Sequence, residues 1–243
     1  MVARTYKNAP IIEAVAEFRF EQEIASDAVN AIAKKVKVNF PNEQDVTFRE
    51  LSVEVDTAKV ETKDDARKKL SNDDETNTVI ISPSSFSISR LAPYTTFDDL
   101  HDICSNVWDI ERKVCGYRKL ERIGLRYINR IDLPYINGEV KFEDYFYLRI
   151  NIPEKYDSIG KYSLQFDVPL PDINCLGRIK SSIGGDVLIG HAAFFVDIDV
   201  MRTKLVPQRK NEIFALLRKM RLAKNDLFES FITDNARRIF DAE

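Results

Sequence analysis

Hydrophobic and polar positions alternate every second residue in several stretches of the chain, which is typical of β-strands with one buried face. The clearest example is 11–20, where Ile12, Ala14, Ala16 and Phe18 alternate with Glu13, Val15, Glu17 and Arg19. The same period predicts a strand over 46–55 with a bulge near 49–50, two short strands within 78–91, and further strands over 118–133, 162–170, 173–183 and 187–200. The pair Gly184–Gly185 separates the last two strands and predicts a tight hairpin turn.

Apolar residues spaced three or four apart predict helices in other stretches. Ser26 or Asp27 caps a first helix, which ends before Pro41, and Thr95 or Thr96 caps a second, which ends at Gly116. The last forty residues also have a helical pattern, with a break near 223–225, and the aromatic-rich stretch 142–150 predicts a helical turn. In 54–75, 13 of the 22 residues are charged, which predicts a hairpin tip or loop, with a partner-binding finger as the alternative.

This order of elements predicts an α+β fold, with an antiparallel sheet and helices packed on one of its faces. The order of elements divides the chain into two halves, residues 1–116 and 117–243, each with a β-α-β(n)-α order. We expect the two halves to form one compact unit. The order is similar to that of TATA-binding-protein-like and helix-grip folds, a similarity that carries no function.

Composition adds limits on location. No stretch approaches 18 uninterrupted apolar residues, the N-terminus lacks a signal-like apolar segment, and the three cysteines are widely spaced. We therefore expect a cytoplasmic protein that does not enter a membrane. No nucleotide-binding or hydrolase motif occurs, so we expect no cofactor.

Arginines recur at every fourth residue of the predicted strand 118–133, where a period of two puts them on one face. They are Arg118, Arg122, Arg126 and Arg130. Because guanidinium groups match phosphate and carboxylate geometry, this row predicts a surface for anions, nucleic acid or a partner. Gly124 on the same face leaves room for close approach. The alternative is that the row is structural, neutralised across strands by Glu13, Glu17, Asp197 and Asp199.

Charge is also segregated along the chain. The whole protein has a net charge of −3, but residues 202–224 hold eight basic residues and one acidic residue, or +7, which leaves −3 − 7 = −10 elsewhere. This segment predicts a basic patch for nucleic acid or an acidic partner, or else an ordinary solvated helix face. Its candidate binding residues are Arg209, Lys210, Arg218, Lys219 and Arg221.

Asp197 and Asp199 lie two residues apart on a predicted strand, as two carboxylate ligands of a magnesium ion do. With Glu13 or Glu17 nearby they would make an acidic metal site, and hence a metal-dependent enzyme. A lone pair of this kind is a weak motif, and the sequence predicts no metal site.

Several short blocks resemble one protein family. They are Asn8 to Ala14 (NAPIIEA), Pro93–Tyr94, Arg122 to Ile131 (RIGLRYINRI), Asp197 to Asp199 (DID), Phe228 to Ser230 (FES) and Ile232 to Asp234 (ITD). Together they are similar to a patchily distributed prokaryotic family of about 250 residues with no assigned activity. The resemblance implies no catalytic residue, and the patchy distribution suggests defence or toxin-type loci.

Since the residues form no catalytic constellation, the leading interpretation is a non-enzymatic binding or accessory protein, a regulatory component of such a locus. It predicts a protein partner, and it leaves nucleic acid and self-association open. A nucleic-acid binder that uses the same basic surfaces, and a metal-dependent enzyme at Asp197 and Asp199, are the alternatives.

Overall fold

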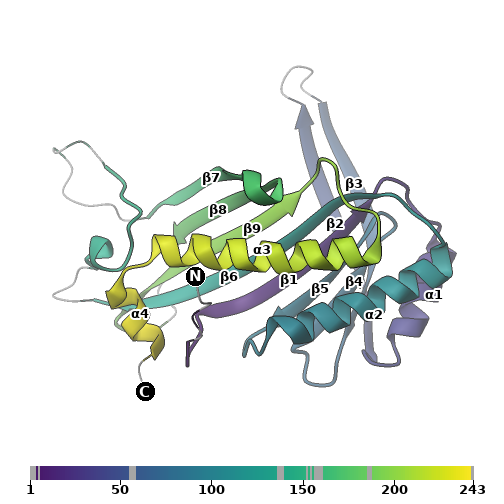
Figure 1. The fold of residues 1–243 in the computed structure, drawn as a ribbon, viewed down its shortest axis with the longest axis horizontal. Coiled ribbons are helices and arrows are strands. Elements are labelled where there is room, and N and C mark those ends of the chain that lie inside the picture. Colours follow the sequence, from purple (N-terminus) through teal and green to yellow (C-terminus); the bar gives the residue numbers. More distant parts are fainter. Residues whose placement is uncertain are drawn as a thin grey trace.

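The computed structural model describes residues 4, 6–54, 59–135, 140–151, 153, 155, 161–184 and 188–241, with side chains from 4 to 47 and from 66 onward within those ranges. Its described part contains one antiparallel sheet of nine strands and four α-helices, with two short 3₁₀ turns (Figure 1). In chain order the elements are β1 (Ile11–Phe20), α1 (Ser26–Val36), β2 (Asn42–Glu54), β3 (Lys59–Ser71), β4 (Asn77–Ile81), β5 (Ser85–Leu91), α2 (Phe97–Cys115), β6 (Leu120–Pro134), η1 (Phe142–Asp144), β7 (Ser163–Leu170), η2 (Pro171–Ile173), β8 (Cys175–Ile183), β9 (His191–Arg202), α3 (Lys210–Phe231) and α4 (Asp234–Asp241).

The strand order is β2-β3-β4-β5-β1-β6-β9-β8-β7, so the first strands of the two predicted halves, β1 and β6, pair at the centre. Next to each of them lies the last strand of its own half, β5 beside β1 and β9 beside β6. The halves therefore share one continuous sheet. They differ between their first two strands, where the first half has the helix α1 and the described part of the second half has only the turn η1.

The four helices lie against one face of the sheet, as the sequence predicts, with α2 and α3 side by side in front of the strands (Figure 1). Alternate residues of β1 and β6, such as Phe18 and Leu125, point into the core between sheet and helices and are fully buried. The opposite face, which we call the open face, carries Glu17 of β1 and Arg122 of β6. None of the described helices covers it.

Helix α2 shows how local chemistry sets element bounds. The hydroxyl of Thr96 accepts a hydrogen bond from the backbone N–H of Asp99, which caps the first turn. Gly116 ends the helix at φ 70°, a conformation that costs glycine little. Both residues agree with the prediction. Helix α1 begins at Ser26 after Ala25 and has no side-chain cap, which differs from the predicted capping by Ser26 or Asp27.

Four local predictions were wrong. The stretch predicted as a tip or loop holds strand β3, which pairs residue by residue with β2. This pairing has no register shift near 49–50, where a bulge was predicted, and residues 55–58 lie outside the described residues. Strand β8 ends at Ile183 and β9 begins at His191, so the predicted two-residue turn does not join them; residues 185–187 lie outside the described residues. Helix α3 has no break near 223–225.

Helix α3 is continuous because its apolar positions form one stripe at steps of three and four, from Ile213 through Met220 to Leu227. Lys224 occupies a position in this stripe. In the sequence alone, a charged residue at that position interrupts the apolar pattern of the helix. In the structure its side chain is buried with the others. None of the helices in the described part of the chain is long and apolar enough to cross a membrane.

Candidate functional site

The open face carries an ion-pair network over β1, β6, β9, β8 and β7. One row across the sheet can be followed through the strand register, residue opposite residue. It runs Ser89, Val15, Arg126, Asp199, Arg178 and Asp167 from β5 to β7. Its charges alternate in sign from β6 outward, so Arg126 lies opposite Asp199, and Arg178 lies between Asp199 and Asp167.

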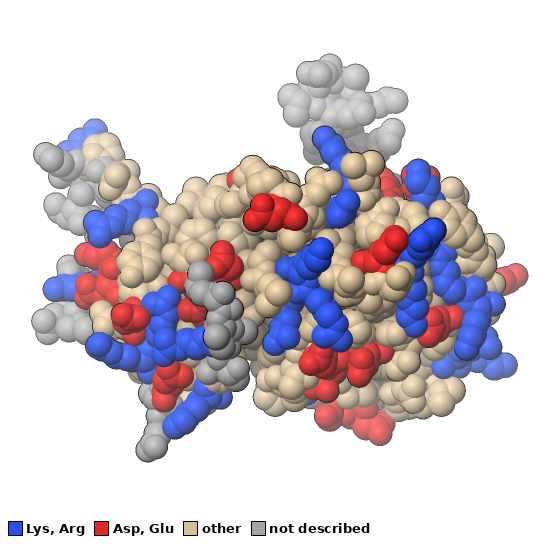
Figure 2. Space-filling view, in the orientation of Figure 1, with Lys and Arg blue, Asp and Glu red and all other residues tan. Residues whose placement is uncertain are grey.

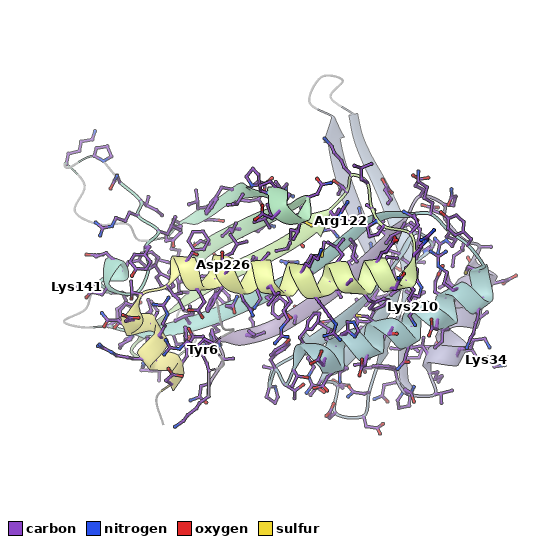
Figure 3. All side chains as sticks on the ribbon, viewed as in Figure 1. Tyr6, Lys34, Arg122, Lys141, Lys210 and Asp226 are labelled. Atoms are coloured by element: carbon purple, nitrogen blue, oxygen red, sulfur yellow. The ribbon has the colours of Figure 1, made fainter. Side chains whose placement is uncertain are left out.

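Arg122 lies at the centre of this network and is labelled in Figure 3. Its guanidinium donates to the carboxylate of Glu17 on β1 and, at 2.8 Å, to Oδ2 of Asp199 on β9. The side chain lies flat over Gly124, where an added Cβ would come within 2.8 Å of Nη1 of Arg122. The glycine on the arginine face therefore makes room for the guanidinium of its own strand.

The other open-face arginines also have carboxylate partners. Arg126 donates two hydrogen bonds to Asp197, from Nε at 2.8 Å and from Nη2 at 2.6 Å, and Arg130 donates to Oδ1 of Asp132 at 2.9 and 3.0 Å. The structural alternative for the arginine row thus describes Arg122 and Arg126, with Glu17, Asp197 and Asp199 as partners. Glu13 accepts a hydrogen bond from Ser89 instead.

Arg178 and Asp167, which the sequence analysis did not single out, form a second bidentate pair, at 2.8 and 2.9 Å. Only the register of β7 against β8 brings them together. Oδ1 of Asp199 is buried without a hydrogen-bond partner among the described residues, and burial raises the pKa of this carboxyl.

The open face of these strands carries no net charge. Alternation and register place on it six carboxylates and six cations: Glu13, Glu17, Asp132, Asp167, Asp197 and Asp199 with Arg19, Arg122, Arg126, Arg130, Arg178 and Lys180. Lys180 is the cation of this set that forms no ion pair among the described residues. A surface balanced in this way does not attract a polyanion by long-range charge.

Arg118 does not belong to the row, and that prediction was wrong. A bulge where β1 and β6 pair sets Arg19 opposite Arg122 but Phe20 opposite Leu120, which shifts the alternation by one residue. Arg118 therefore points to the helix side, where it is 5% exposed, lies 4.2 Å from the ring centroid of Phe20, and donates to Glu111 of α2 at 3.1 Å. It also donates to the main-chain carbonyls of Gln22 and Pro83. Its guanidinium therefore links the segment before β6 to α2, to the chain just after β1 and to the turn between β4 and β5.

The basic segment 202–224 is interleaved with acids from α2. Lys210, labelled in Figure 3 at the start of α3, donates to both carboxylate oxygens of Asp109 at 2.7 Å, and Arg218 pairs with Asp98 at 2.8 Å. Arg221 lies over the ring of Phe97. Figure 2 shows the result, with red and blue side chains next to one another over the helix face. The segment is basic in sequence, but it does not form a uniform basic patch.

Of the remaining candidates, Arg209 directly precedes α3, is largely exposed and lies 3.8 Å from Glu212. Lys219 of α3 forms no ion pair among the described residues. Lys224 is different, since it is buried with its Nζ 3.9 Å from the ring centroid of Tyr127. Burial lowers the pKa of Lys224 to about 7.

The carboxylates proposed for a metal site are held by arginines. Asp197 binds Arg126, and Asp199 and Glu17 share Arg122. In the part of the chain that the structure describes, no group of three or more histidine, cysteine, aspartate or glutamate side chains is placed to hold a metal ion.

The chain matches none of the models of known protein families against which it was scanned, and a search of curated proteins also gives no match.

Proposed function

We propose that the protein is a non-enzymatic binding protein that presents the open face of its sheet to a protein partner. The observation that carries the proposal is the combination of a broad face that none of the described helices covers with charges that are already paired within it. By analogy with the family it resembles, we place this role in a defence or toxin-type locus, as a regulatory component.

The pairing favours a protein over a nucleic acid. A phosphate backbone is bound through cations that release its counterions, and such cations need to be free of carboxylates. On the open face Arg122, Arg126 and Arg178 each contact a carboxylate within 2.8 Å. A protein partner whose surface carries both signs of charge can contact such a face while the ion pairs of the face stay intact. Arginine is also enriched at protein interfaces.

Site-specific photocrosslinking in the source cell tests this proposal. A photoreactive amino acid replaces Gln165 or Lys180, which are exposed on the open face, or Val38 or Leu222, which are exposed on the helix side. We expect one discrete protein adduct from the open-face positions and none from the helix-side positions. Equal adducts from both sides, or adducts with nucleic acid alone, would contradict the proposal.

A charge-reversal variant provides a second test of the proposal. Lys180→Glu changes the open face without breaking an ion pair, and Lys34→Glu makes the same change on the exposed side of α1 (Figure 3). We expect Lys180→Glu to remove the adduct formed at Gln165 and Lys34→Glu to leave it. If the adduct persists in Lys180→Glu at wild-type yield, the partner does not use this face.

A further inference from the structure

A cavity of about 390 Å³ lies between the turn η2 and helix α3, away from the open face. Asp172 and Ile173 of η2 form one wall, Arg202 at the end of β9 forms another, and Glu212, Leu216 and Lys219 line it from α3. The three α3 residues follow at steps of four and three, so they share one face of the helix. In Figure 1, η2 is the short green coil at the end of β7, and its residues contact α3.

Four charged groups line this cavity without close ionic partners in the described part of the chain. Asp172 and Lys219 form no ion pair there, and Glu212 has only the 3.8 Å contact with the exposed Arg209. Arg202 donates to the main-chain carbonyls of Lys204, at 3.2 Å, and Ile173, at 3.5 Å. Most charges on the open face are paired, so this cavity differs from that face by collecting charges that a ligand can neutralise.

The charges also indicate the class of ligand. Two cations and two carboxylates sum to zero, so a polyphosphate would meet Asp172 and Glu212 as like charges. A small zwitterion satisfies both signs. Ile173 and Leu216 add apolar surface, and the volume falls within the range of small-molecule sites.

We propose that this cavity binds a free amino acid with an apolar side chain. Its carboxylate is held by Arg202 and Lys219, its ammonium group by Asp172 and Glu212, and its side chain contacts Ile173 and Leu216. This site is independent of the open face and of the function proposed for it.

Isothermal titration calorimetry on the full chain tests the proposal, with leucine, isoleucine, valine, methionine and phenylalanine as probes. We expect saturable binding of at least one of them. Blocking its carboxylate as the amide, or its amine as the N-acetyl derivative, removes charge-assisted hydrogen bonds and weakens binding about tenfold or more. No saturable binding by any of the five at millimolar concentration would overturn the proposal, as would equal binding of a blocked derivative. Tighter binding of leucyl-leucine would assign the cavity to peptides instead.

Variants locate the binding. Lys219→Met and Glu212→Gln each remove one charge from the cavity, and we expect each to weaken binding about tenfold. Arg218→Met removes a neighbouring cation of α3 that does not line the cavity, and we expect unchanged affinity. Thermal unfolding of each variant confirms that the fold is intact. Wild-type affinity in Lys219→Met and Glu212→Gln would place the bound amino acid elsewhere and reject the site.

Discussion

Lys224 provides the sharpest test of the packing between α3 and the sheet. Its ammonium group is buried over the ring of Tyr127, and the Tyr127 hydroxyl lies 3.1 Å from that of Tyr94. Burial, helped by nearby Arg221 and opposed by Glu229, lowers the pKa of Lys224 from 10.5 to about 7. The native state therefore holds this amine neutral over a pH range in which the unfolded chain keeps it protonated.

The sign and size of the effect follow from proton linkage. Between about pH 7 and pH 10 the unfolded chain binds one more proton at Lys224 than the native protein does, so the free energy of unfolding rises with pH and falls as the pH drops toward 7. At about 1.4 kcal/mol for each pKa unit, the rise between about pH 7 and pH 8.5 amounts to roughly 1–2 kcal/mol. Above that range the cysteines interfere, because burial raises the pKa of Cys104 and of Cys115.

Urea unfolding monitored by the fluorescence of Trp108, which is buried, measures this slope. We expect Lys224→Met to remove the pH dependence between pH 7 and pH 8.5, and to be at least as stable as the wild type at pH 7, because the methionine carries no desolvation penalty. Lys219→Met, an exposed substitution on the same helix, should keep the wild-type slope. If the slope is the same in Lys224→Met as in the wild type, or if the wild type shows none, then Lys224 is not buried as described.

Two further predictions concern the arginines, both measured by urea unfolding. Arg118→Ala should lower the free energy of unfolding by about 3–5 kcal/mol, because it removes the hydrogen-bonded partner of the buried Glu111 and leaves it only the 3.8 Å contact with Arg112. Arg178→Ala, whose side chain is 39% exposed, should cost about 0–1 kcal/mol, and equal costs would show that Arg118 is at the surface. Gly124→Ala should lower the free energy of unfolding by about 1–3 kcal/mol, because the added methyl group displaces the guanidinium of Arg122. In an Arg122→Ala background the same substitution should cost little, and additive costs would contradict the placement of the Arg122 side chain over Gly124.

Much of the fold was predictable because it depends on local pattern. Alternation set the faces of β1 and β6, and the capping residues Thr96 and Gly116 set the bounds of α2. The sequence also named Glu17, Asp197 and Asp199 as candidate partners of the arginine row. It did not identify which carboxylate meets which arginine, since a pair such as Arg178 and Asp167 depends on strand register.

The sequence by itself determined the α+β class, the strand faces and the presence of arginines on one side of the central strand, because each follows from the geometry of a few consecutive residues. Only the tertiary structure decided what those arginines do. The bulge at Arg19–Phe20, where β1 pairs with β6, turned Arg118 into the core, while register paired Arg122 and Arg126 with carboxylates. The packing of α3 on β6 likewise buried Lys224, which belongs to a segment that is basic in sequence. Burial and charge pairing depend on contacts between residues that are far apart in the chain, and a local sequence pattern does not encode such contacts.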